Sequence, residues 1–306
     1  MGIDWSAWSW SVAVWWGFLL AVSAGNIVMF LLLVGRFGAH SCNRAQARSG
    51  GRRWLALAPW GEPWVLLCAA YVFGCAFRAA LPRADVQRIC LFDTWLSTVV
   101  VGRSVATVAE ICFALQWAIV LRQIATLTRS DTARNISLAV VPLILIAECC
   151  SWYAVITTDY LANALENSLW AVAFSLVAVA LLRLSIEFRG LVRLAMATAL
   201  IGLAAYVAFM AMVDVPMYLS RWQADAIGGK TSMSLLAGLY DVSTRLVVTH
   251  DIAQWRQEIV WMSLYFSVAV WSSLALCAFR LVRHRLPHYR AQPVDAQPLP
   301  LRIAAE

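Results

Sequence analysis

The chain has 306 residues, of which 62% are apolar and 13% are charged, and its formal net charge is +7. Soluble domains are close to half apolar and about one quarter charged, so this composition excludes an ordinary soluble enzyme, a disordered chain and a disulfide scaffold. The 16 tryptophans agree, because indole rings gather where hydrocarbon meets water. The sequence therefore predicts an all-α, polytopic membrane protein.

A transmembrane helix needs about 20 predominantly apolar residues to cross about 30 Å of hydrocarbon. Strands are not expected, because the apolar runs are continuous rather than alternating. We predict one transmembrane domain over residues 1–290, followed by a disordered, proline-containing cytoplasmic tail over 291–306. The domain contains seven apolar stretches, at residues 11–34, 59–81, 97–121, 136–158, 166–186, 194–217 and 258–282.

The arginines predict the orientation of this seven-helix bundle. Sixteen basic residues lie on the side of the connections after spans 1, 3 and 5 and of the tail, whereas seven lie on the opposite side. Positive residues mark the cytoplasmic face, so we expect the amino terminus outside and the carboxyl terminus inside. This asymmetry explains the net charge without a nucleic-acid partner. Lys230 is the single lysine, a bias that suggests a GC-rich bacterial genome and hence the inner membrane.

The outer segment between spans 6 and 7 is longer than a connection requires. Residues 232–248 are apolar, yet charges interrupt them too often for a membrane span. Asp241 and Arg245 are one helical turn apart and can form an ion pair. We predict that 232–248 form an outer interfacial helix or a lid over the bundle.

Spans 3 and 4 carry ionisable residues at the depth of the hydrocarbon. A charge is costly there, so each of these residues is expected to have a structural or functional role. Arg103 and Glu110 are nearly two turns apart, so they share one helix face with Thr107 between them. Glu148 lies at about the same depth on the neighbouring antiparallel span. These residues predict a binding site for a proton or a cation, in which paired carboxylates perturb each other's pKa. The alternative is a buried ionic cluster that fixes helix packing.

A second polar group is predicted at the outer surface. It combines Asp214, near the end of span 6, with His250, Asp251 and Glu258 before span 7. Imidazole with carboxylates can act as an acid and a base, bind a metal, or form a solvated face. Trp255 and Trp261 could line a pocket for a cationic or amphipathic ligand, or belong to an aromatic belt.

Neither a metal site nor a cofactor is predicted. The eight cysteines include no CxxC pair and no Cys/His spacing typical of zinc. The other three histidines lie in a cytoplasmic loop and in the tail, so His250 has no histidine partner outside. Most cysteines are expected to be small buried residues. A disulfide between Cys75 and Cys90 is left open.

Three functions fit these features. The first is a transporter or carrier of a proton, a cation or a small polar or amphipathic solute, with Arg103, Glu110 and Glu148 as its coupling site. The second is a membrane enzyme that acts on a lipid or lipophilic substrate through the outer acid/base group. The third is a non-catalytic sensor that uses the same outer pocket. The expected partners are membrane lipids and a small-molecule or ion ligand, and the oligomeric state is open.

Overall fold

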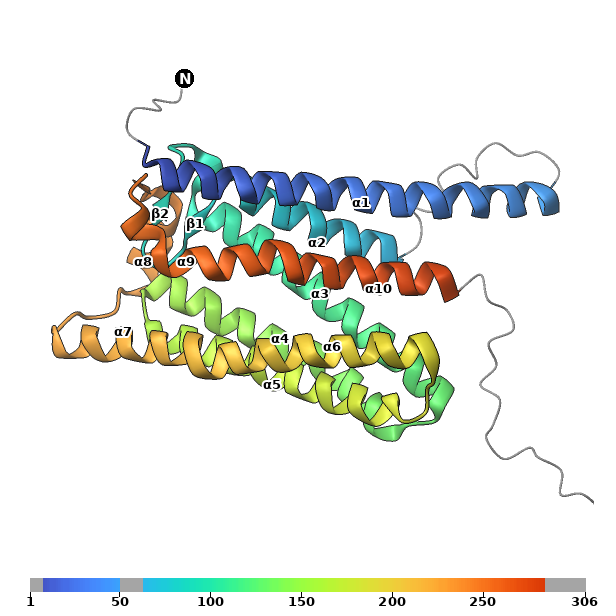
Figure 1. Ribbon diagram of the computed structural model, residues 1–306. Helices are drawn as coiled ribbons and strands as arrows, with labels where there is room; N and C mark the ends of the chain where they lie inside the picture. The colour runs from blue at the N-terminus through green and yellow to red at the C-terminus, as the bar shows by residue number, and fades with distance from the viewer. Residues whose placement is uncertain (1–7, 50–62, 284–306) are drawn as a thin grey trace, which may run out of the picture.

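In the part of the chain that the structure describes, seven helices are long and apolar enough to cross a membrane, which agrees with the predicted number of spans. The computed structural model describes residues 8–49 and 63–283, with side chains for 8–36 and 63–279 (Figure 1). The predicted tail and the first residues of the predicted span 59–81 lie outside these ranges. The first five spans are α1 to α5, with bounds Trp10–Ser49, Pro63–Ala80, Val99–Thr128, Asp131–Thr157 and Tyr160–Ser185.

The last two spans each contain a π-helical turn. In the sixth, α6 (Gly190–Phe209) passes through Met210–Asp214 into α7 (Val215–Ile227). In the seventh, α9 (Ile252–Leu264) passes through Tyr265–Ala269 into α10 (Val270–Arg283). The sixth span has 38 residues, which corresponds to about 57 Å of helix. It is much longer than the predicted 194–217, and α7 extends beyond the other helices (Figure 1).

Tight turns join α3 to α4 and α4 to α5. Arg129 and Thr158 end the first two of these helices in the left-handed conformation, with φ of 55° and 58°. The residues that follow them, Ser130 and Asp159, cap the next helices by accepting hydrogen bonds from backbone N–H groups. Such short connections make α3, α4 and α5 antiparallel neighbours.

The helices pack in chain order around an apolar core. Each of α1 to α5 contacts the next helix, and α10 returns to contact α1, α2 and α3. Aromatic rings fill the centre: Tyr71 stacks on Phe113 with 4.5 Å between ring centroids, and Trp170 stacks on Phe174 at 5.6 Å. This arrangement places one face of each of α3, α4 and α5 toward the interior.

A small sheet and α8 (Leu235–Thr244) cover one end of the bundle. The sheet contains β1 (Arg83–Ala84), β2 (Ile89–Cys90) and β3 (Val247–Val248), with β1 antiparallel and β3 parallel to β2. The seven spans are helices and not strands, as expected from their continuous apolar runs, and these three two-residue strands lie in the connections outside the spans. The segment 232–248 is helical only over α8, since its end pairs with β2 instead.

Arg88 and Gly238 attach this cap to the bundle. Arg88 has φ of 62° and forms a 2.6 Å ion pair with Asp241 of α8. Its Nη2 donates to the carbonyl of Val155 near the end of α4 at 2.9 Å. A Cβ at Gly238 would overlap the carbonyl of Ile156, so glycine permits the close approach of α8 to α4.

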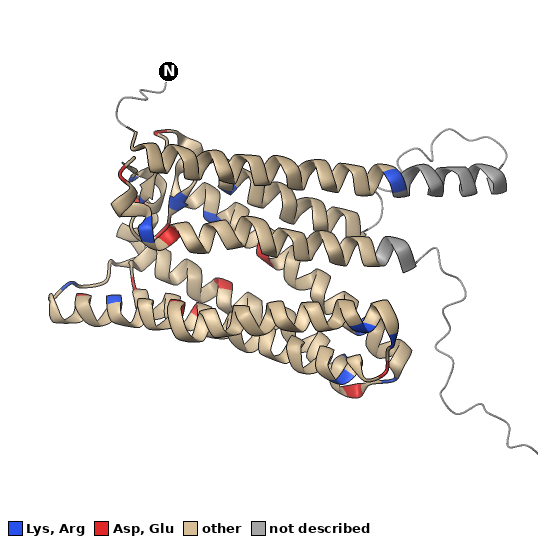
Figure 2. Cartoon of the chain, viewed as in Figure 1, with Lys and Arg blue, Asp and Glu red and all other residues tan. Residues whose placement is uncertain are grey.

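Charged side chains are distributed unevenly along the bundle. Buried acidic residues lie in the half of the bundle beside the sheet, whereas the charged residues at the opposite end lie near helix ends and in the connections between helices (Figure 2). The polar interior therefore lies nearer to the end that the sheet and α8 cover.

Candidate functional site

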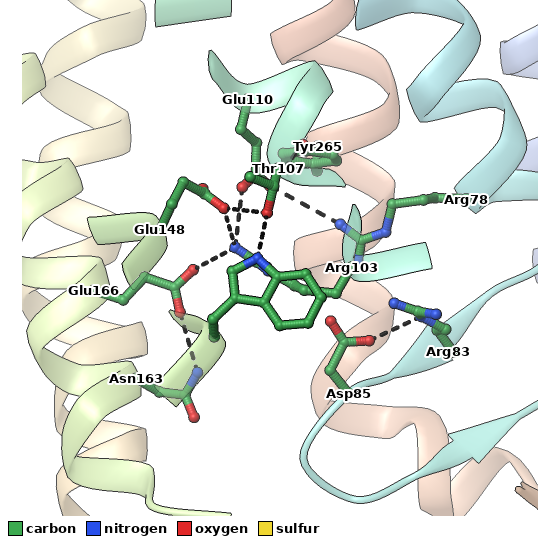
Figure 3. A network of polar contacts seen from close by, with 11 residues as sticks. Arg78, Arg83, Asp85, Arg103, Thr107, Glu110, Glu148, Asn163, Glu166 and Tyr265 are labelled. Atoms are coloured by element: carbon green, nitrogen blue, oxygen red, sulfur yellow. Dashed lines mark hydrogen bonds and ion pairs between the residues drawn. The ribbon is translucent and has the colours of Figure 1, made fainter. Parts of the chain in front are cut away.

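One guanidinium group of α3 contacts three carboxylates inside the bundle (Figure 3). Arg103 Nη2 lies 3.2 Å from Glu110 Oε2 on the same helix, 2.9 Å from Glu148 Oε2 on α4 and 3.3 Å from Glu166 Oε1 on α5. All four residues are at most 8% exposed. We call these four residues the Arg103 cluster.

The geometry of the helices brings these residues together. Arg103 and Glu110 face the same way because their spacing is close to two turns, as the sequence predicts. Glu148 meets them because α4 runs antiparallel to α3 after a tight turn. The structure thus brings together the three charged residues that were predicted as a binding site.

Glu166 was not included in the predicted site. The predicted span 5 begins at Glu166, which would leave its carboxylate at the membrane surface. In the structure Asp159 caps the helix and α5 begins at Tyr160, so Glu166 lies almost two turns inside. The sequence does contain a sign that Glu166 faces the interior: Asn163, Glu166 and Asn167 are spaced three and four positions apart, which places these polar side chains on one helix face.

Each carboxylate of the Arg103 cluster also has other neighbours. Glu110 Oε1 accepts a 2.8 Å hydrogen bond from the Tyr265 hydroxyl, and Glu166 Oε2 accepts one of 3.1 Å from Asn163 Nδ2. Glu148 Oε2 accepts a 2.6 Å bond from Thr107. Its other oxygen, Oε1, has no hydrogen-bond partner among the described residues.

A second arginine stands beside the cluster, but the charges do not cancel. Arg78 of α2 lies 4.0 Å from Glu110, Nη1 to Oε1. Arg78 and Arg103 supply two positive charges, whereas the three glutamates would supply three negative ones if all were ionised. A net charge is costly in hydrocarbon. The site is therefore suited to one additional positive charge, either a proton or a cation.

Arg83 and Asp85 form an ion pair in the hairpin that covers the cluster, with 2.9 Å between Nε and Oδ1. Burial disfavours the carboxylate, but Arg83, Arg78 and Arg103 outweigh it and lower the pKa of Asp85. Burial also lowers the pKa of Arg83 to about 10, because repulsion from Arg78 and Arg103 adds to it and outweighs the attraction of Asp85 and Cys90. The hairpin thus places a charged pair between the cluster and the end of the bundle.

Both π-helical turns contribute a residue to the polar interior. Tyr265 begins one turn and donates to Glu110, while Asp214 ends the other and accepts a 2.5 Å hydrogen bond from Asn167 Nδ2. Within the turn that Tyr265 begins, the carbonyl of Phe266 accepts a 2.8 Å hydrogen bond from Asn26 Nδ2. Such turns interrupt regular helices and frequently lie at functional sites.

The four residues of the predicted outer group do not come together in one site. His250 Nε2 bonds the carbonyl of Leu91 at 2.8 Å, and its ring stacks on Trp8. Asp251 is exposed and caps α9. Asp214 bonds Asn167, as described above. The fourth residue, Glu258, pairs with Arg221 of α7 at 3.7 Å.

The two predicted aromatic residues lie on different sides of α9. Trp255 is fully buried and donates through Nε1 to the carbonyl of Thr249 at 3.0 Å. Trp261 is parallel to Phe209 of α6, with 6.3 Å between ring centroids. Trp255 therefore packs in the core, and Trp261 is the one that faces the sixth span.

The described cysteines are free thiols, so Cys75 and Cys90 are not bridged. The Cys90 thiol instead faces backbone carbonyls, including that of Phe92 at 3.5 Å, and its burial raises its pKa. Over residues 8–36 and 63–279, whose side chains the structure describes, no three His, Cys, Asp or Glu side chains are arranged to hold a metal ion.

No protein-family model matches the chain, and no curated protein or solved structure is detectably similar to it. The function is therefore inferred from the geometry of the Arg103 cluster.

Proposed function

We propose that the protein is a multi-pass transporter or carrier of a proton, a cation or a small polar or amphipathic solute, and that the Arg103 cluster is its coupling site. One observation carries the proposal: three buried carboxylates share the guanidinium of Arg103. With Arg78 this makes two positive charges against three negative ones, so one carboxylate lacks a compensating charge. A group that moves charge across a membrane needs a site that is stable with and without its ion. Intramembrane ionisable residues commonly have this role.

The positions of the partners also support exchange. The three carboxylates come from three different helices, α3, α4 and α5, so a shift between helices changes how many of them reach Arg103. Tyr265, which begins a π-helical turn, donates to one of them. A local break in a helix that touches a charged site provides a place where such a shift can start.

We also infer the setting of this activity. The loop arginines favour an orientation with the sheet and α8 outside and the arginine-rich connections in the cytoplasm. The predicted location is a cell membrane, namely a bacterial inner membrane. In that orientation the Arg103 cluster faces the external medium more closely than the cytoplasm.

The test uses purified protein reconstituted into liposomes that contain a pH-sensitive dye. A pH gradient or a potassium diffusion potential should drive a flux that empty liposomes lack. Glu110→Gln and Glu148→Gln should each abolish the flux while the protein keeps its helical content and elution volume. Glu187→Gln is the matched control, because Glu187 is an exposed carboxylate between α5 and α6.

The competing interpretation, a cluster that only fixes helix packing, gives a different result. Glutamine has nearly the shape of glutamate but no charge, so a structural role predicts unfolded or aggregated Glu110 and Glu148 variants. Folded variants that retain full flux would contradict the proposal.

A further inference from the structure

Two oxygen atoms on one face of α4 are buried without a hydrogen-bond partner. Glu148 Oε1 and the Ser151 hydroxyl have none among the described residues, and these side chains are 3% and 0% exposed. They are three positions apart, so they lie on the same helix face. Buried polar atoms are usually paired, and two unpaired oxygens on one helix face beside a charged cluster point to a ligand.

A third oxygen-bearing group faces the same place from α5. The Glu166 carboxylate lies beside the Ser151 hydroxyl, although the two do not meet the geometry of a hydrogen bond. Arg103 holds one oxygen of Glu166, and Asn163 holds the other at 3.1 Å. Glu148 and Glu166 each touch the same nitrogen of Arg103, so these two carboxylates lie close together on the facing helices.

We propose that Glu148, Ser151 and Glu166 bind a monovalent alkali cation, Na⁺, between α4 and α5. Carboxylate and hydroxyl oxygens are the ligands that hard cations prefer, at distances of about 2.3–2.6 Å for an ion of this size. An ion at such distances bridges oxygens that are too far apart to bond each other directly. Asn163 is a positioning residue, because it orients the Glu166 carboxylate.

The charge of the site selects a monovalent ion. Arg78 and Arg103 leave one of three carboxylates uncompensated, so Na⁺ makes the site neutral whereas a divalent ion would make it positive. A proton would also neutralise the charge. However, one proton satisfies one oxygen, whereas a cation satisfies Glu148 Oε1 and Ser151 Oγ together.

This inference rests on the proposed function, because it identifies the coupling ion of the same cluster. Its test is a binding measurement that does not depend on transport. Purified protein in detergent is titrated with radioactive sodium at constant ionic strength, with choline as the replacement cation. We expect saturable binding of about one ion per chain.

The variants separate a ligand from a structural residue. Ser151→Ala should weaken sodium binding at least tenfold, roughly the scale of losing one group that supports a metal site. Ser137→Ala is the matched control, because Ser137 is a buried serine of α4 whose hydroxyl donates to the carbonyl of Arg134. Its binding should equal that of the wild type.

Two outcomes overturn the inference: folded wild-type protein that shows no saturable sodium binding, or Ser151→Ala protein that binds as tightly as Ser137→Ala. If proton flux in liposomes persists without sodium in either case, the transport proposal stands and the ion is the proton. If sodium binds in the predicted way but no gradient drives any flux, the transport proposal fails while the sodium site stands.

Discussion

Arg103 of α3 and Glu148 of α4 are 2.9 Å apart, Nη2 to Oε2, and both are almost completely buried. A buried ion pair contributes little to stability by itself, because desolvation offsets the attraction. Removing one member is different, since the other charge is left without compensation. This asymmetry makes the pair a sensitive probe of the cluster.

Arg103→Gln should destabilise the protein by about 3–5 kcal/mol, because Glu110, Glu148 and Glu166 lose their shared cation. Arg103→Gln combined with Glu148→Gln should recover part of this loss, since the double variant has one unpaired carboxylate fewer. Thermal unfolding in detergent, followed by circular dichroism, measures both. Arg193→Gln, at an exposed position of α6, is the control and should change little. A double variant whose loss equals the sum of the single losses would argue against a shared site.

The ion pair between Arg83 and Asp85 predicts how the stability of the protein depends on pH. The pKa of Asp85 is lowered in the folded protein, so its carboxylate contributes stability above the pKa of the unfolded chain. That contribution is lost as pH falls through the lowered, folded-state value. Melting temperatures of the wild type and of Asp85→Asn, measured from neutral pH downward, should therefore converge in acid. Parallel curves would mean that Asp85 does not titrate with folding.

The spans and part of the cluster could be predicted because they depend on local rules. Hydrophobic length sets the seven spans, and helical periodicity alone places Arg103 and Glu110 on one face. The depth of Glu148 follows from counting along antiparallel helices. None of these features depends on contacts between helices that are distant in the sequence.

The rest depends on tertiary contacts or on exact helix ends. Glu166 enters the cluster because α5 begins six residues earlier than the hydropathy suggests. Arg78 was not part of the predicted site, although its guanidinium approaches Glu110 from α2. The pairing of β2 with β3 joins residues more than 150 positions apart, and no local pattern encodes it.

Gly238→Ala should loosen the cap without altering the Arg103 cluster. A methyl group there overlaps the carbonyl of Ile156, which is backbone and cannot move aside, so α8 must shift. We expect a loss of about 1–3 kcal/mol, the usual cost of overpacking, and faster proteolysis between α7 and β3. Gly202→Ala is the control, since a Cβ at Gly202 meets nothing within 4 Å. Equal stability and equal proteolysis of the two variants would contradict close packing of α8 on α4.

Tyr265→Phe tests the link between the π-helical turn and the cluster. The phenol donates to Glu110 Oε1 at 2.8 Å, and without it this oxygen keeps only Arg78 at 4.0 Å, while Arg103 contacts the other oxygen, Oε2, at 3.2 Å. A hydrogen bond to a charged group contributes about 1.5–3 kcal/mol, so the melting temperature should fall. Flux in liposomes should also slow several-fold, because Glu110 loses the donor that orients it. Tyr153→Phe, which removes the hydroxyl of a half-exposed tyrosine on α4, should leave stability and flux unchanged. If Tyr265→Phe lowers the melting temperature but leaves the flux intact, the tyrosine supports the fold alone and the π-helical turn has no part in coupling.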